Sequence, residues 1–156
     1  MGMKSIFVIL LVLLSNVVIV STRAAETKPG SGNELDSVQG EWGRELSPED
    51  IKQGLRKAVK EIKGSKETVT FYGEDNKILR KHRVDFKLEK NGDIRVFTYS
   101  NMEVIDGEGK GARNPDSFSY VYRVYNDRFF EVAGLLPGEE GPVTVFSWKK
   151  HKKEAK

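Results

Sequence analysis

The chain has 156 residues, a formal net charge of +3 and no cysteine. This length suits about one domain, and the lack of cysteine excludes disulfides and lipid attachment to an N-terminal cysteine. Part of the basic excess comes from Lys4 and Arg23, which precede a predicted cleavage site, so the remaining chain is nearly neutral and gives no indication of a nucleic-acid partner.

Residues 1–24 have the pattern of a signal peptide. Lys4 supplies a positive charge, and a nearly unbroken apolar run follows at 6–20. This run is shorter than the roughly 20 apolar residues that cross a bilayer comfortably. Cleavage is predicted after Ala24, with Ala25 as the next choice. We therefore expect a secreted or periplasmic protein without a membrane span after cleavage, and an uncleaved membrane anchor is the alternative.

The segment 25–36 is predicted to be a flexible linker, because it contains Pro, Gly, Ser and charged residues and little apolar material. The folded domain is predicted at 37–150, with a basic tail at 151–156. Within the domain, Ser47, Pro48 and Asp50 form a helix start. Apolar residues at helical spacing extend this helix to a stop at Gly64. They are Ile51, Leu55, Ala58, Val59 and Ile62.

After this helix, apolar and polar residues alternate with period two, which is typical of strands. Asn91-Gly92 and Asn126-Asp127 are predicted hairpin turns. The strands that follow the helix are predicted at 68–72, 77–90, 93–104, 118–125, 128–136 and 143–150. With the opening strand, this pattern predicts a mainly β fold, an antiparallel up-and-down barrel of seven or eight strands with one short helix after the first strand. A two-sheet sandwich is the alternative.

The opening Gly40-Glu41-Trp42 resembles the G-x-W motif of lipocalin-like barrels. The order of further motifs resembles a family of secreted planctomycete lipocalin-like domains of unknown function. These motifs are Pro48-Glu49, Gly109-Lys110-Gly111, Tyr122 to Asp127, and Pro137 to Pro142. The resemblance covers roughly 38–150, although Val38 stands where the family has Leu and Gly141 lengthens the last turn.

The resemblance implies a lipocalin-like barrel in which Gly40 and Trp42 close one end, with the tryptophan under a basic side chain of the last strand. Lys149 and Lys150 lie in the region where that side chain is expected. The family brings no established activity, and ligand carriage would be inferred from the fold alone.

Four residues are candidates for binding a ligand inside the barrel. Arg80 and His82 lie on the predicted inward face of one strand, where they suit an anionic or polar ligand group. Tyr120 and Tyr122 share a face of another strand and offer hydroxyl groups. The structural alternatives are a strand end that emerges into solvent for the first pair and ordinary core packing for the tyrosines.

The sequence indicates no catalytic, metal or cofactor site. It contains two histidines, too few for a zinc site without several carboxylates, and it lacks a G-x-S-x-G motif. The glycine-rich loop at 106–117 matches neither a calcium-binding nor a phosphate-binding loop. We therefore expect a non-enzymatic domain that binds a small, partly apolar molecule. The alternatives are an envelope accessory protein that acts through its surface and a hydrolase with two carboxylates.

Overall fold

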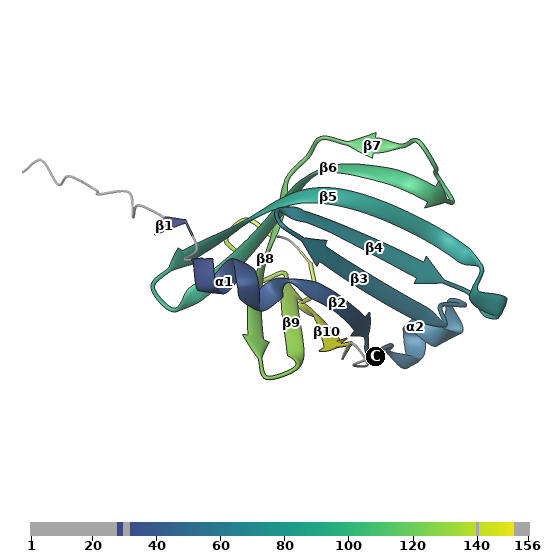
Figure 1. Cartoon of the computed structure of the whole chain (residues 1–156), viewed down its shortest axis with the longest axis horizontal. Coiled ribbons are helices and arrows are strands. Elements are labelled where there is room, and N and C mark those ends of the chain that lie inside the picture. The colour runs from purple at the N-terminus through teal and green to yellow at the C-terminus, as the bar shows by residue number, and fades with distance from the viewer. Residues whose placement is uncertain (1–27, 30–31, 140, 152–156) are drawn as a thin grey trace, which may run out of the picture.

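The computed structural model describes residues 28–29, 32–139 and 141–151. The predicted signal peptide and the tail beyond His151 lie outside these ranges. Eight antiparallel strands form a barrel in the order β2–β3–β4–β5–β6–β8–β9–β10, as Figure 1 shows. They are β2 (Gly40–Arg44), β3 (Lys57–Lys63), β4 (Lys66–Tyr72), β5 (Ile78–Asn91), β6 (Ile94–Gly107), β8 (Phe118–Tyr125), β9 (Arg128–Ala133) and β10 (Thr144–Lys150).

Strand β10 closes the barrel, because it pairs with β9 on one side and with β2 on the other. The predicted up-and-down barrel is thereby confirmed, and the sandwich alternative is excluded. Two short strands extend the wall: β1 (Lys28–Pro29) pairs with β5, and β7 (Arg113–Asn114) pairs with β6. The helices are α1 (Gly32–Val38) and α2 (Pro48–Lys52).

The prediction of a long helix from Pro48 to Gly64 is wrong after Lys52. Helix α2 ends at Lys52, and residues 57–63 form β3, which pairs with β2 and β4. Ala58 and Ile62 fit a helical spacing, but they also alternate inward with Lys60, which is buried. Because the middle inward residue is a lysine, the period-two pattern of this strand was hidden.

Smaller differences between prediction and structure concern the linker at 25–36 and one turn. Residues 32–36 of the predicted linker belong to α1. The hairpin expected at Asn91-Gly92 is present, but Asn91 pairs with Ile94, so the turn residues are Gly92 and Asp93. In the glycine-rich loop, Gly107 has a positive φ of 78°, and a Cβ there would lie 2.4 Å from the Leu79 carbonyl oxygen. Only glycine suits this close approach to β5.

One end of the barrel is closed by packed aromatic side chains beneath α1. Trp42 is fully buried, contacts the Phe129 ring edge-on, and donates a hydrogen bond of 2.9 Å from its indole nitrogen to the Val38 carbonyl at the end of α1. Phe97 lies between the Phe86 and Tyr120 rings, with centroids 4.5 and 5.1 Å away. These contacts fill the interior at this end and anchor the helix over it.

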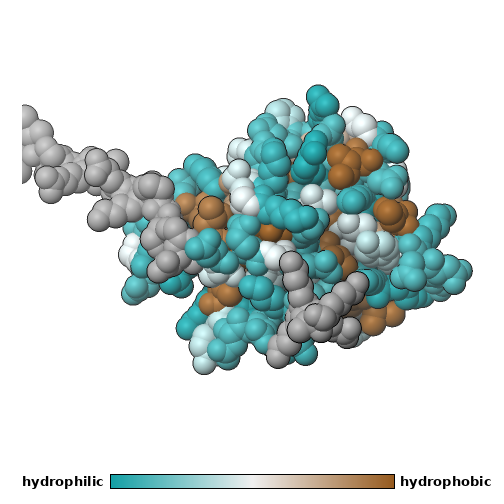
Figure 2. Space-filling view, viewed as in Figure 1, coloured by the Kyte–Doolittle hydropathy of each residue, from teal (hydrophilic) through white to brown (hydrophobic). Residues whose placement is uncertain are grey.

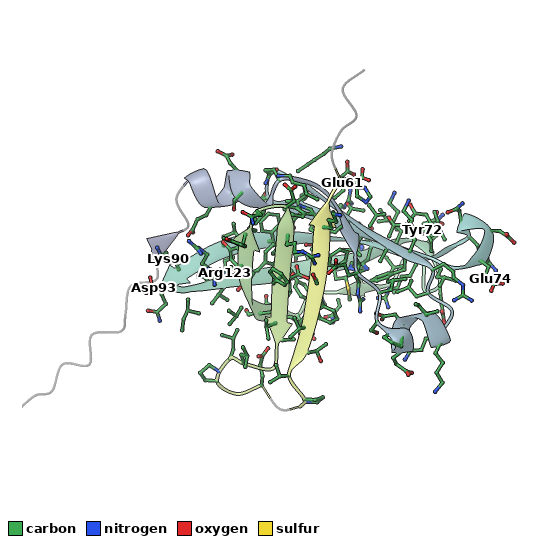
Figure 3. All side chains as sticks on the ribbon, turned by 90° about the horizontal axis from the view of Figure 1, so that it is seen from below. Glu61, Tyr72, Glu74, Lys90, Asp93 and Arg123 are labelled. Carbon is green, nitrogen blue, oxygen red and sulfur yellow. The ribbon has the colours of Figure 1, made fainter. Side chains whose placement is uncertain are left out.

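Helix α2 lies toward the other end of the barrel and buries none of its residues (Figure 1). Its start is the predicted one: the Ser47 hydroxyl accepts a hydrogen bond from the Asp50 backbone, and the Asp50 carboxylate accepts one from the Ser47 backbone. Figure 3 separates the two ends, with Tyr72 and Glu74 at one and Lys90 and Asp93 at the other. In the view of Figure 2, most of the surface is hydrophilic, with apolar residues standing apart.

Candidate functional site

The barrel interior is not filled along its whole length, because a cavity of about 350 Å³ lies beyond the aromatic end. All eight barrel strands contribute side chains to it, and together these are both polar and apolar. Its lining includes Arg44, Lys60, Glu67, Val69, Phe71, Arg80, His82, Val84, Tyr99, Met102, Tyr120, Glu131, Phe146 and Trp148. A space of this size lies at the lower end of small-molecule pockets.

The deepest part of the cavity holds three ionisable residues, Lys60, Glu67 and Glu131, which we call the ionic cluster. Each is at most 5% exposed. The Lys60 ammonium donates a hydrogen bond to Glu131 and lies 3.0 Å from the Glu67 Oε2 atom. Since Lys60 comes from β3, Glu67 from β4 and Glu131 from β9, the cluster joins separate parts of the barrel wall.

Aromatic side chains hold this cluster in place. The Tyr120 hydroxyl donates a hydrogen bond of 2.9 Å to Glu131, and the Trp148 indole donates one of 2.8 Å to its other oxygen. The Lys60 ammonium lies 4.5 Å from the Trp148 ring centroid and 4.9 Å from that of Phe129. These contacts supply cation–π attraction in addition to the ion pairs.

Burial and charge shift the pKa values of the cluster in a consistent way. Burial alone would lower the pKa of Lys60, but the nearby Glu131 and Glu67 carboxylates raise it overall, so its ammonium stays charged. Burial raises the pKa of Glu67 to about 7, against the attraction of Lys60, and the Glu131 charge adds to the rise. Burial and the two carboxylates raise the pKa of Tyr120 well above 10.0. The raised pKa of Glu67 therefore places its proton exchange near neutral pH.

Arg80 and His82 stand farther along the cavity wall, on the inward side of β5. Arg80 is exposed, whereas the His82 ring packs against Phe71 with centroids 5.8 Å apart. Burial and the charges of Arg80 and Lys60 lower the pKa of His82 to about 4. Its imidazole is thus neutral at physiological pH, and its Nδ1 atom is buried without a hydrogen-bond partner.

Arg44 lines the cavity from β2 and is tied to α2. Its guanidinium lies 3.0 Å from both carboxylate oxygens of Asp50 and 4.7 Å from the Phe146 ring centroid. These partners fix the side chain and neutralise its charge. Arg80 differs, because no carboxylate in the described part of the chain pairs with it, and its nearest polar contact is the Met102 sulfur at 3.9 Å.

Three of the four predicted ligand-binding residues line this cavity, namely Arg80, His82 and Tyr120. The fourth, Tyr122, does not. Its ring packs edge-on against Phe97 and Phe129 at the closed end, and its buried hydroxyl has no hydrogen-bond partner. Burial, with a contribution from Glu34, raises the pKa of Tyr122 to about 12.

Gly40 and Trp42 lie at the closed end of the barrel. The Lys150 ammonium stands 4.9 Å from the Trp42 ring centroid, so a basic residue of the last strand does lie over this tryptophan. Gly40 has a φ of +112°, and the Lys150 side chain lies 3.5 Å from the place of a Cβ. Lys149, the other residue considered for this contact, is exposed.

Sequence reasoning missed the ionic cluster and Trp148. The helical spacing around Lys60 predicts a helix there, Glu67 precedes the predicted strand at 68–72, and Glu131 stands among apolar residues of the predicted strand at 128–136. One available signal was the position of Glu131 between Phe129 and Ala133, on the side of β9 that alternation turns inward. A charged residue at such a position predicts a buried partner of opposite charge.

Comparisons with protein-family models, with curated proteins and with solved structures give no match. The lipocalin-like resemblance is therefore supported only at the level of an eight-stranded antiparallel barrel. Among the described residues, no group of histidine and carboxylate side chains is arranged to hold a metal ion. Within the same ranges, no helix is long and apolar enough to cross a membrane.

Proposed function

We propose that the barrel binds a small, partly apolar molecule in the cavity beside the ionic cluster. The main support is the combination of an unfilled interior of about 350 Å³ with buried charged groups at its deep end. Buried charges cost stability, and apolar residues of similar size are often as stable or more so. A cluster retained beside an open cavity is therefore better explained by recognition of a ligand than by folding.

The experiment is titration of the purified protein with 8-anilinonaphthalene-1-sulfonate, followed by its fluorescence and by the indole NMR signals of the two tryptophans. We expect saturable binding that moves the Trp148 signal, because Trp148 lines the cavity, and leaves Trp42 nearly unchanged. Val69→Trp fills the cavity and should abolish binding. Val145→Trp, on the exposed outer wall, is the matched control and should keep it. Equal binding by both variants would contradict the proposal.

A second candidate function is docking on an anionic lipid surface through the outer face of β6, β8, β9 and β10. Four valines stand side by side across these strands in register, Val96, Val121, Val132 and Val145. Val145 is 61% exposed, and a groove beside it includes Phe130 and Tyr125. A row of outward apolar side chains, half-buried at Val96, Val121 and Val132 and exposed at Val145, suits contact with an apolar surface.

The charge of this outer face favours a negatively charged partner. Its outward positions carry Arg123, Arg128 and Lys149, of which Arg128 is paired with the Glu45 carboxylate. The outward residues described on β8, β9 and β10 include no carboxylate themselves, so Arg123 and Lys149 supply the positive charge. Figure 3 shows Arg123 near the end marked by Lys90 and Asp93. A two-fold dimer through this face would bring like charges together. Anionic lipid head groups match the cations, and the valines would contact the interfacial region.

Flotation with vesicles tests this second candidate. We expect binding to vesicles that contain phosphatidylglycerol and little binding to phosphatidylcholine alone. Val145→Glu should remove it, whereas Val59→Glu on the outer side of β3 should not. Binding that ignores lipid charge, or that survives Val145→Glu, would refute the assignment of this face.

A further inference from the structure

Two described residues that line the cavity have a buried polar atom without a hydrogen bond, namely Glu67 at Oε2 and His82 at Nδ1, and Glu67 lies at the deep end. Its side chain is 6% exposed, and its Oε2 atom has an ion pair with Lys60 at 3.0 Å but no hydrogen bond. The other carboxylate of the cluster, Glu131, accepts hydrogen bonds from Tyr120 and Trp148 as well as from Lys60. A buried carboxyl without a hydrogen-bond partner is costly, so a ligand group that supplies one gains affinity.

Among the described residues that line the cavity, the Arg80 guanidinium is a charged group without a charged partner. Arg44, Arg83 and Arg113 each pair with a carboxylate, whereas the described residues offer Arg80 only the Met102 sulfur. An arginine in this state is suited to an incoming carboxylate, to which it can donate two parallel hydrogen bonds. The exposed end of the cavity therefore favours an anionic group.

Strand register gives the spacing between these two positions. Glu67 pairs with Val84, and Phe71 pairs with Arg80, so the two levels lie four residues apart along β4 and β5. At a rise of about 3.3 Å per residue, the levels are roughly 13 Å apart at the backbone, and the long side chains shorten the gap. The wall between them carries the apolar side chains of Val69, Phe71 and Val84, together with the neutral imidazole of His82 opposite Val69.

We propose that the ligand is an amphipathic carboxylate with an apolar, two-ring-sized body and a hydroxyl at its far end, the hydroxyl bonding to Glu67 and the carboxylate to Arg80. This inference rests on the proposed binding function and adds the ligand class and its orientation. A hydroxyl suits Glu67 in either protonation state, because it donates to the carboxylate and accepts from the carboxylic acid. A primary ammonium or a carbonyl would suit one state only.

The test uses four probes of equal body size: 6-hydroxy-2-naphthoate, 2-naphthoate, 2-naphthol and naphthalene. Affinities are measured by calorimetry, with the Trp148 indole NMR signal to verify the place of binding. We expect 6-hydroxy-2-naphthoate to bind about tenfold more tightly than 2-naphthoate, as a hydrogen bond to a buried carboxyl supplies. Its advantage over 2-naphthol should be a few-fold and should shrink as salt is added, because Arg80 is exposed.

Two variants assign these advantages to their residues. Glu67→Met keeps the side-chain length, and Lys60 keeps its ion pair with Glu131. In this variant 6-hydroxy-2-naphthoate should no longer bind more tightly than 2-naphthoate, but it should still bind more tightly than 2-naphthol. In Arg80→Met it should still bind more tightly than 2-naphthoate, but no longer more tightly than 2-naphthol. Arg83→Met is the matched control, since Arg83 stands on the same strand but points outward to Glu103, and it should change neither. Circular dichroism and melting curves of each variant verify that it folds.

The outcomes separate this inference from the function on which it rests. If all four probes bind in the cavity with equal affinity, the cavity binds apolar molecules without recognising a hydroxyl or a carboxylate. The proposed ligand class is then wrong, and water supplies the hydrogen bond to Glu67. If the four probes differ in affinity for the wild type and the same differences remain in Glu67→Met and Arg80→Met, the assigned residues are wrong. If no probe moves the Trp148 signal and 8-anilinonaphthalene-1-sulfonate does not bind either, the proposed binding function itself fails.

Discussion

At the end of the barrel covered by α1, Trp42, Phe97 and Phe129 fill the interior, whereas toward the other end Lys60 and the carboxylates line an open cavity. Both regions are built by inward-pointing residues of the same strands. Alternation along a strand therefore determines which way a side chain points, but not whether the space it enters is filled. That choice depends on the size and charge of each inward residue.

The helices at the two ends also differ in how much apolar surface they bury. Val38 of α1 is fully buried, and the Trp42 indole is bonded to its carbonyl. Helix α2 buries no residue and is held by its own cap and by the Arg44–Asp50 ion pair. The closed end thus contributes apolar burial, which stabilises the fold. The cavity end leaves space and buries charge, both of which lower stability, as expected of a region with the binding function proposed above.

The largest predicted effect comes from Lys60→Met, which breaks the charge balance of the cavity end. The variant leaves Glu67 and Glu131 buried without a cation, so the free energy of unfolding should fall by about 3–5 kcal/mol at neutral pH. Denaturant unfolding measures it. The triple variant Lys60→Met, Glu67→Met, Glu131→Gln removes every charge of the cluster, so it should recover most of the loss. The glutamine amide keeps an acceptor oxygen for the Trp148 indole and can donate its N–H to the Tyr120 hydroxyl, which then accepts. A triple variant as unstable as the single one would contradict this account.

The contrast between the ends also explains what the sequence could predict. The long strands, the hairpin at 126–127 and the closed barrel followed from period-two alternation and turn residues. Trp42 was recognised through its neighbour Gly40. At the closed end, inward positions are apolar, so alternation of burial and alternation of hydropathy coincide there.

At the cavity end, the alternation of burial no longer coincides with the alternation of hydropathy. Lys60 points inward between Ala58 and Ile62, and Glu67 is buried at the start of β4. A pattern based on hydropathy assigns such charged residues to the surface. With Lys60 placed outward, the remaining apolar residues of 57–63 fit a helical spacing, so a helix is predicted where β3 lies. Arg80 and His82 were found because alternation alone placed them inward. Of the ionic neighbours, Lys60 and Glu67 lie on the consecutive strands β3 and β4, whereas Glu131 lies on β9, and no local pattern links a residue so far along the chain to them.

The second prediction tests how firmly α1 closes its end. Trp42→Phe removes the hydrogen bond to the Val38 carbonyl and leaves this buried acceptor without its partner, so stability should fall by about 1–3 kcal/mol. Hydrogen exchange should become faster in α1, while 8-anilinonaphthalene-1-sulfonate binding stays unchanged. Trp148→Phe is the counterpart at the cavity and should alter probe binding. If Trp42→Phe alters binding as strongly, the two ends are not independent.

The third prediction concerns pH. The pKa of Glu67 is raised to about 7 from an ordinary value of 4.5, so the folded protein binds this proton more tightly than the unfolded chain. Its stabilising contribution is complete below about pH 4.5 and is lost as pH rises through 7. We expect wild type to lose stability relative to Glu67→Gln between pH 5 and pH 8, as melting curves would show.

His82 acts in the opposite direction, which is why the comparison must be made between variants. Its pKa is lowered from 6.5 to about 4, so its contribution is present above pH 6.5 and is lost as pH falls toward 4. The difference between wild type and Glu67→Gln cancels this term. His82→Gln should instead flatten the acid limb. A wild-type curve parallel to that of Glu67→Gln would show that Glu67 does not titrate in this range.

The smallest predicted effect is at α2, where the cap is exposed. Ser47→Ala removes the hydroxyl that accepts from the Asp50 backbone, at a cost of about 1 kcal/mol. Because α2 buries none of its residues, the loss should stay local: hydrogen exchange speeds up at 48–52, and probe binding in the cavity is retained. Ser47→Asp keeps a capping acceptor and is the matched control. If Ser47→Ala weakens probe binding as Val69→Trp does, then α2 holds the cavity through Arg44 and Asp50, and this end of the barrel depends on its helix as the closed end depends on α1.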